Sequence, residues 1–294
     1  MKVAIYGQYY QNSTEPIIRD IFVFFNKNKV DLVIQDTFLE MLYEKEIIRK
    51  DYVTFHDFSD LPKDTDVLVS IGGDGTILRA ATLVRDSGIP ILGINAGRLG
   101  FLAAVQKENI EEFLQFLIDG KYSLSSRTVI GLESDSEIPE TASLDFAMNE
   151  ISVSRKDSAS MITIETYLND EYLTSYWADG LIISTPTGST GYSLSCGGPI
   201  LTPEVNSFVI TPIAPHNLNA RPLVIPDSTE IKLKVSGREE QYLVSLDSRV
   251  AVISNESILK ISKKEFVINM VEIPGKSFLK TLRNKLLWGE DKRN

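Results

Sequence analysis

The sequence predicts an α/β domain followed by a mostly antiparallel β domain, with a final helix that returns to the first domain. Over about the first 120 residues, short apolar runs alternate with amphipathic stretches, which is the pattern of repeated βαβ units. Beyond Lys121, short β-branched runs separated by turn residues replace the helical periodicity. We therefore expect a Rossmann-like α/β domain over residues 1–123 and an antiparallel, sandwich-like β domain over 124–274. A helix over 275–294 is expected to pack back on the first domain.

The elements of the first domain follow from its apolar pattern. Apolar runs of strand length occur at residues 2–6, 31–35, 66–71 and 90–94. Amphipathic stretches of helix length occur at residues 15–26, 37–48, 76–85 and 109–118. The first helix carries its apolar side chains on one face, at Ile17, Ile18, Ile21, Phe22 and Phe25. Gly120 is expected to end the last helix.

The strands of the second domain are predicted from β-branched runs bounded by turn residues. These runs occupy residues 127–132, 146–154, 162–168, 181–184, 208–213, 230–235, 242–246, 258–261 and 266–271. In the final helix, four leucines are expected to share one face, namely Leu279, Leu282, Leu286 and Leu287.

The composition excludes several classes of protein. The chain of 294 residues holds 30 Lys and Arg against 40 Asp and Glu, a net charge of −10, which argues against binding to nucleic acid or an anionic membrane. One cysteine, Cys196, cannot form a disulfide within the chain, and two histidines cannot complete a Cys/His zinc site. The sequence has no signal peptide and no apolar run of about 18 residues, so we expect a cytoplasmic protein.

The strongest local motif is Gly72-Gly73-Asp74-Gly75-Thr76, which lies between a predicted strand and a predicted helix. Glycines allow close approach of a ligand, and a helix N-terminus offers unpaired N–H groups to an anion. Asp74 would lie at the carboxyl end of a strand, where open α/β sheets bind ligands. Considered alone, the motif fits equally well an ordinary turn in which Asp74 caps the helix.

Four further segments carry unusual polar groups. Residues 93–102, GINAGRLGFL, form either a turn that faces a ligand or a tight structural turn. Residues 178–200 are rich in hydroxyl groups and glycines, which favours hydrogen bonding to ribose and phosphate oxygens. Asn149 and Glu150 interrupt an apolar run, and taken alone they fit a hydrogen-bonded core network best. In residues 212–223, His216 is by itself more often structural than catalytic.

Together the five segments resemble the NAD kinase family. The resemblance covers about residues 66–250 and depends on GGDGT, GINAGRLGFL, NE, DGLIISTPTGSTGYSLSCGGPI and PIAPHNLNARPLV in this order. It implies a two-domain enzyme that transfers the γ-phosphoryl group of ATP to the 2′-hydroxyl of the adenosine ribose of NAD. It also implies a divalent cation, with Mg²⁺ expected, and a homodimer or homotetramer.

The resemblance assigns roles to residues at matching positions. Asp74 is implied as the proton acceptor, and Gly72, Gly73 and Gly75 as the phosphate loop. The positions matched to NAD contacts are Asp74, Gly75, Arg79, Phe101, Asn149, Glu150, Asp179, Thr190, Gly191, Tyr192, Ser193, Leu194 and Ser195. Weaker candidates for NAD contact are Arg249 and His216. No metal ligand is assigned.

Four positions depart from the family pattern. Gly191 replaces a common Ala, Arg249 replaces a neutral amide, and Ser160 and Trp177 replace residues that are often basic. The departures at Ser160, Trp177 and Arg249 leave open a non-catalytic NAD sensor. A related GGDG kinase acting on a lipid or sugar hydroxyl is the other alternative, against which the downstream motifs argue. Neither nucleic acid nor a membrane is expected as a partner.

Overall fold

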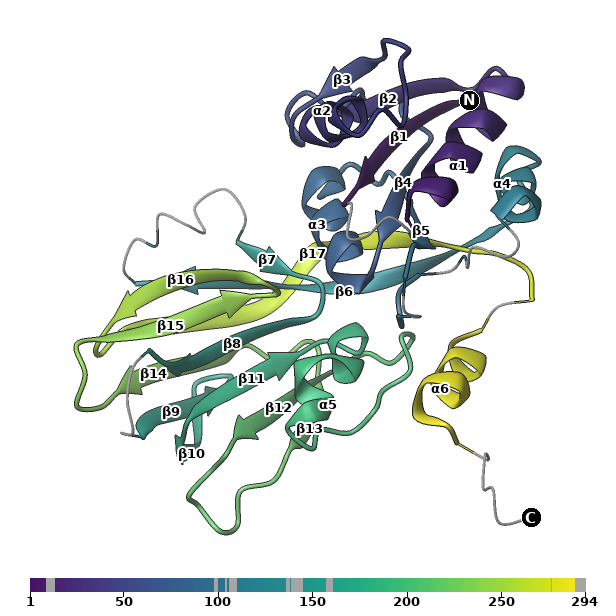
Figure 1. The fold of residues 1–294 in the computed structure, drawn as a ribbon. Coiled ribbons are helices and arrows are strands. Elements are labelled where there is room, and N and C mark those ends of the chain that lie inside the picture. Colours follow the sequence, from purple (N-terminus) through teal and green to yellow (C-terminus); the bar gives the residue numbers. More distant parts are fainter. Residues whose placement is uncertain are drawn as a thin grey trace. The chain divides into compact units, whose positions relative to one another are not determined.

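The computed structural model describes residues 1–8, 14–97, 100–103, 105, 110–135, 138, 145–156, 161–275 and 277–288. The chain divides into two compact units (Figure 1). The first unit combines Met1–Ser126 with Ile268–Asn294, and the second is Arg127–Val267. The predicted α/β and antiparallel β classes are both confirmed, as the strand pairing in each unit shows.

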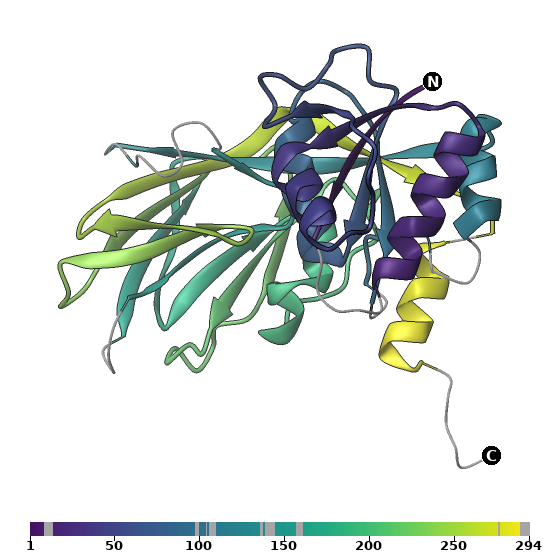
Figure 2. The same cartoon turned by 45° about the horizontal axis from the view of Figure 1, so that its top comes forward.

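The first unit contains a parallel sheet in the order β5-β4-β1-β2-β3. Its strands are β1 (Lys2–Gly7), β2 (Asp31–Gln35), β3 (Val53–Phe55), β4 (Val67–Gly72) and β5 (Ile91–Asn95). Its helices are α1 (Glu15–Lys27), α2 (Asp36–Glu44), α3 (Asp74–Val84), α4 (Ile110–Ile118) and α6 (Phe278–Leu286). Helices α1 and α4 lie side by side (Figure 2).

The apolar face predicted for α1 is buried. Ile18, Ile21 and Phe25 are completely buried in the same core as Val3 and Ile5 of β1. Burial of one such side chain stabilises the fold by about 1.5–3 kcal/mol, which explains why this periodicity is a reliable signal.

Two predictions in the first unit need correction. The second helix ends at Glu44 instead of residue 48, because Glu46 adopts a left-handed conformation with φ 53°. Strand β3 was not predicted, since it has three residues and both Val53 and Thr54 are exposed. Such a short edge strand has no alternating pattern that the sequence could reveal.

The final helix is also shorter than predicted and differently packed. It begins after Ser277, whose hydroxyl accepts a hydrogen bond from the Lys280 N–H, and it ends before Leu287. Of the four leucines expected on its buried face, Leu282 is buried, whereas Leu279 and Leu287 are 61% and 62% exposed. Lys276 and residues 289–294 lie outside the described residues. Among the described helices, none has the length and apolar character needed to cross a membrane.

The second unit is built from antiparallel strands in two sheets that share one apolar core. One sheet has the order β13-β12-β11-β8-β15-β16, and the other contains β10-β9-β14-β17 with β6 and β7. The strands are β6 (Ser123–Ser134), β7 (Phe146–Ala147), β8 (Glu150–Arg155), β9 (Ile162–Leu168), β10 (Glu171–Ala178), β11 (Gly180–Ser184), β12 (Ser207–Ile213), β13 (Leu223–Pro226), β14 (Ile231–Ser236), β15 (Gln241–Leu246), β16 (Arg249–Ser254) and β17 (Ile258–Glu272). The core receives Val153 and Ile183 from the first sheet and Ile164 and Leu233 from the second. This arrangement is the predicted sandwich.

Several strand boundaries differ from the prediction. The single strand expected over 146–154 is divided into β7 and β8, and the two expected over 258–261 and 266–271 form the continuous strand β17. Strands β10, β13 and β16 were not predicted. They are the outermost strands of their sheets, where side chains such as Trp177, Val224 and Val250 are exposed and obscure the alternation of burial.

Candidate active site

The GGDG segment connects β4 to α3 in the first unit. A Cβ atom on Gly72 would lie 2.3 Å from Thr76 Oγ1, so this position requires glycine. Gly73 is the residue that precedes the helix, and no side chain caps it. The interpretation of Asp74 as a helix cap is therefore wrong, because Asp74 is the first residue of α3.

The Asp74 carboxylate is held by the end of the second motif. Its Oδ2 accepts a hydrogen bond from Phe101 N at 2.7 Å, and its Oδ1 accepts one from Leu102 N at 3.1 Å. A Cβ atom on Gly100 would lie only 1.8 Å from Oδ1. The loop can approach the carboxylate this closely only because residue 100 has no side chain. Arg98 and Leu99 of the same motif lie outside the described residues.

The surroundings of Asp74 leave room on one side. Gly75 is exposed, and a Cβ atom there would meet nothing within 4 Å. Arg79 follows about one helical turn later and is also exposed. The Phe101 ring contacts the final helix, where Lys285 Nζ lies 5.7 Å from the ring centroid. The first unit thus gathers the predicted glycines, Asp74 and Phe101 around the start of α3.

In the second unit, Asn149 and Glu150 lie where β7 gives way to β8. The Asp247 carboxylate accepts hydrogen bonds from the N–H groups of Met148, Asn149 and Glu150. Burial raises the pKa of the Glu150 carboxyl to about 8; the nearby Asp247 adds to this shift, and a hydrogen bond from the Tyr192 N–H opposes it. Glu150 therefore carries its proton at neutral pH in the unliganded protein and can donate a hydrogen bond.

The hydroxyl-rich motif packs against this pair. It forms a 3₁₀ turn (Thr187–Thr190) and a short helix, α5 (Tyr192–Ser195). The Thr185 hydroxyl donates to the Met148 carbonyl at 2.6 Å. A Cβ atom on Gly191 would lie 3.0 Å from Glu150 Oε2 and 3.3 Å from Asn149 Nδ2. Gly191, which replaces an Ala common in the family, therefore leaves space beside the Asn149 and Glu150 side chains.

Two buried oxygens at this place lack hydrogen-bond partners in the described part of the protein. They are Asn149 Oδ1 and Glu150 Oε2. An unsatisfied buried oxygen is costly, so native proteins usually supply a partner, often a water molecule or a ligand. By contrast, the Ser193 hydroxyl is buried and paired with Thr211 Oγ1 at 2.8 Å. This pairing directs Ser193 into the protein core.

The remaining predicted residues lie on neighbouring segments of the second unit. Asp179 Oδ2 pairs with Arg155 Nη2 at 3.2 Å. The His216 N–H donates to the Trp177 carbonyl at 2.7 Å, and Asn217 Oδ1 accepts from Trp177 N at 2.7 Å. The fifth motif thus hydrogen-bonds to the outer edge of β10.

Family models match most of the chain. The ATP-NAD kinase N-terminal domain matches residues 9–122, and the ATP-NAD kinase C-terminal domain matches residues 148–273. The chain belongs to the ATP-NAD kinase family. The resemblance drawn from the sequence is therefore confirmed, and with it the expectation of an ATP-dependent enzyme that phosphorylates NAD.

Individual members of the family agree with this assignment. The chain is 70% identical to an NAD kinase from Flavobacterium johnsoniae and 41% identical to one from Bacteroides fragilis, with full coverage of both chains in each case. Its fold matches yeast NADH kinase complexed with NADH, with a TM-score of 0.85, 23% identity, and coverage of 99% of this chain and 89% of that one. It also matches an Archaeoglobus fulgidus NAD kinase in complex with ATP, with a TM-score of 0.76, 24% identity, and coverage of 98% and 99%.

Two residues beside the predicted site of this ATP-NAD kinase family member were not assigned a role from the sequence. They are Leu102 and Asp247. Leu102 acts through its main chain, which leaves no signature in side-chain type. Asp247 lies in a segment that the resemblance matches, but the partners of its carboxylate lie 97 to 99 residues away in sequence.

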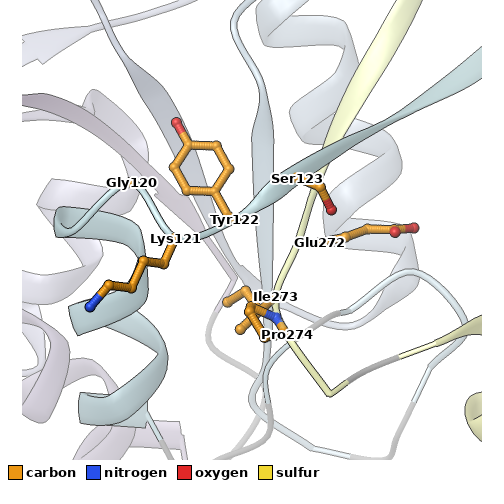
Figure 3. Close-up of a pocket in the computed structure, with 7 residues that line it drawn as sticks. All are labelled: Gly120, Lys121, Tyr122, Ser123, Glu272, Ile273 and Pro274. Atoms are coloured by element: carbon orange, nitrogen blue, oxygen red, sulfur yellow. The ribbon is translucent and has the colours of Figure 1, made fainter.

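A pocket in the first unit contains none of the predicted site residues. Its volume is about 410 Å³, and it is lined by Gly120, Lys121, Tyr122, Ser123, Glu272, Ile273 and Pro274 (Figure 3). The Lys121 amine and the Glu272 carboxylate point away from each other. Because its charged groups do not converge, the pocket lacks the arrangement typical of a site that recognises a charged ligand.

Proposed function

We propose that this ATP-NAD kinase family member phosphorylates the 2′-hydroxyl of the adenosine ribose of NAD, with Asp74 as the proton acceptor. The observation that carries the proposal is the fixed Asp74 carboxylate at the carboxyl end of β4, held by the N–H groups of Phe101 and Leu102. A ribose hydroxyl is a weak nucleophile until a base accepts its proton.

The hydrogen bonds to Asp74 leave its carboxylate able to accept another one from a substrate hydroxyl. Each carboxylate oxygen accepts one amide N–H, and a carboxylate has about four lone-pair sites in total. A substrate hydroxyl can therefore donate to the same group. Phosphoryl transfer depends mainly on positioning and charge stabilisation, so the carboxylate can take the proton late in the reaction.

The loop and helix around Asp74 suit a phosphate group. A Cβ atom on Gly73 or on Gly75 would meet nothing within 4 Å, and the N-terminal turn of a helix such as α3 generally favours an anion. We assign the ATP phosphates to this segment, with Arg79 as a nearby positive charge.

Magnesium is expected to arrive with ATP. Within the described ranges, no three His, Cys, Asp or Glu side chains gather as metal ligands. Proteins usually hold Mg²⁺ through substrate phosphates and one or two carboxylates. When bound, the cation would neutralise phosphate charge.

We assign recognition of NAD to the second unit. Asn149 Oδ1 and Glu150 Oε2 are buried without partners, and hydroxyl groups of a ribose could supply hydrogen bonds to both. Asp179, Thr190, Gly191, Tyr192, Leu194 and Ser195 complete the proposed set. A homodimer or homotetramer and a cytoplasmic location remain predictions.

The decisive test is NADP formation from NAD and ATP with Mg²⁺, compared with an NAD analogue that lacks the 2′-hydroxyl on the adenosine ribose. We expect turnover with NAD and none with the analogue. Equal phosphorylation of the analogue would show that another hydroxyl is the acceptor. Binding of NAD without consumption of ATP, with any divalent cation, would instead support the sensor.

A further inference from the structure

The hairpin formed by β15 and β16 holds the Asn149–Glu150 segment in place. Strands β15 and β16 are joined through Asp247, which adopts a left-handed conformation with φ 53°. Asp247 Oδ1 accepts hydrogen bonds from Asn149 N at 2.8 Å and Glu150 N at 3.2 Å, and Oδ2 accepts one from Met148 N at 3.1 Å. The Asp247 N–H in turn donates to the Glu150 carbonyl at 2.9 Å.

Three successive N–H groups that converge on one anion form a main-chain anion site. Here the anion is a side chain of the same protein. Met148 and Asn149 lie in the interruption between β7 and β8, and Glu150 is the first residue of β8. Burial raises the pKa of the Asp247 carboxyl, while the three N–H donors and the positive charge of Arg249 oppose that shift.

Arg249 contacts Phe146, at the other end of the segment from Phe146 to Glu150. Its guanidinium donates a hydrogen bond to the Phe146 carbonyl, and its Cζ lies 5.5 Å from the centroid of the Phe146 ring. Both contacts join the Arg249 side chain to Phe146. They give a structural reason for an arginine where the family usually has a neutral amide.

We propose that Asp247 and Arg249 are positioning residues for NAD: together they fix the main chain from Phe146 to Glu150, so that Asn149 and Glu150 are held ready to bind the dinucleotide. The inference rests on the proposed function, which gives Asn149 and Glu150 the NAD contacts. Neither Asp247 nor Arg249 needs to touch NAD in this role.

The test compares Asp247→Asn and Arg249→Gln with the wild type and with a control, Asp227→Asn. Asp227 is buried in the same unit and pairs with Lys263 at 2.5 Å, but it makes no contact with the Asn149 segment in the described structure. NAD affinity is measured by calorimetry, KM for NAD and for ATP from NADP formation, and folding by thermal unfolding.

Asp247→Asn keeps the shape of the side chain but replaces one acceptor oxygen with an N–H donor. We expect it to weaken NAD binding about tenfold, the effect of losing one charge-assisted hydrogen bond, with KM for ATP changed less than about twofold. Arg249→Gln should raise KM for NAD about threefold, the effect of losing a weaker contact. Asp227→Asn should leave both KM values unchanged, even where it lowers the unfolding temperature.

Wild-type affinity for NAD in a folded Asp247→Asn variant would overturn the proposal. Equal rises in KM for NAD and in KM for ATP in Asp247→Asn would also overturn the proposal. So would a rise in KM for NAD no larger than that of Asp227→Asn, because Asp247 would then have only a structural role. If Asp247→Asn does not fold, the KM for NAD of Arg249→Gln tests the proposal. An unchanged KM for NAD in that variant would contradict it. Failure of the wild type to bind NAD would instead reject the proposed function.

Discussion

Gly100→Ala tests the contact that holds Asp74. The Ala Cβ atom would lie 1.8 Å from Asp74 Oδ1, whereas ordinary contact begins at 3.4 Å. The loop and the carboxylate must therefore separate by about 1.6 Å, which breaks or lengthens the hydrogen bonds from Phe101 N and Leu102 N.

A displacement of about 1 Å at a reacting group can lower a rate about 100-fold. We therefore expect kcat for NADP formation to fall about 100-fold in Gly100→Ala. The free energy of unfolding should fall by about 1–3 kcal/mol, the usual cost of overpacking. The kinetic constants are measured with saturating ATP, and unfolding with denaturant.

Gly97→Ala is the matched control, because it makes the same substitution in the same loop. A Cβ atom there would meet nothing within 4 Å, so kcat should change less than about twofold. A folded Gly100→Ala protein with the kcat of the wild type would refute the reasoning. An equal loss of kcat in both variants would show that the loop, and not the Asp74 contact, is responsible.

Two further predictions concern the second unit. In the folded protein the pKa of Glu150 is about 8, against 4.5 for an ordinary glutamate, so the native state binds more protons between these values. Unliganded stability should therefore fall as pH rises from about 5 to 8, and Glu150→Gln should flatten this slope in urea unfolding. Arg155→Met removes the partner of Asp179 at 3.2 Å. It should raise KM for NAD about three- to fivefold, as expected for a partly exposed ion pair, without changing KM for ATP.

Each of these predictions has a clear contrary result. Identical pH slopes for the wild type and Glu150→Gln would mean that Glu150 does not keep its proton on folding. An unchanged KM for NAD in Arg155→Met would mean that the ion pair does not orient Asp179 for binding.

The sequence could predict features that depend on local pattern. The apolar spacing of α1 identified its buried face, and the GGDG segment was correctly placed between a strand and a helix. A helix that is buried on one side has regularly spaced apolar residues, and a run of glycines is visible directly in the sequence.

Features that depend on distant partners could not be predicted. Asp74 accepts from residues 27 and 28 positions away, and the Asp247 carboxylate accepts from residues 97 to 99 positions away. No local pattern encodes such pairings. Leu279 and Leu287 also had the spacing of a buried face, but tertiary structure left both exposed.

The most direct test of the account is the turnover of Asp74→Asn measured together with its affinity for NAD. Asp86→Asn, an exposed change in the same unit, serves as the control. We predict that Asp74→Asn lowers kcat at least about 100-fold, the contribution typical of a general base, while the Kd for NAD changes less than about threefold. A folded Asp74→Asn protein that forms NADP at the rate of the wild type would contradict the assignment of Asp74 as the proton acceptor.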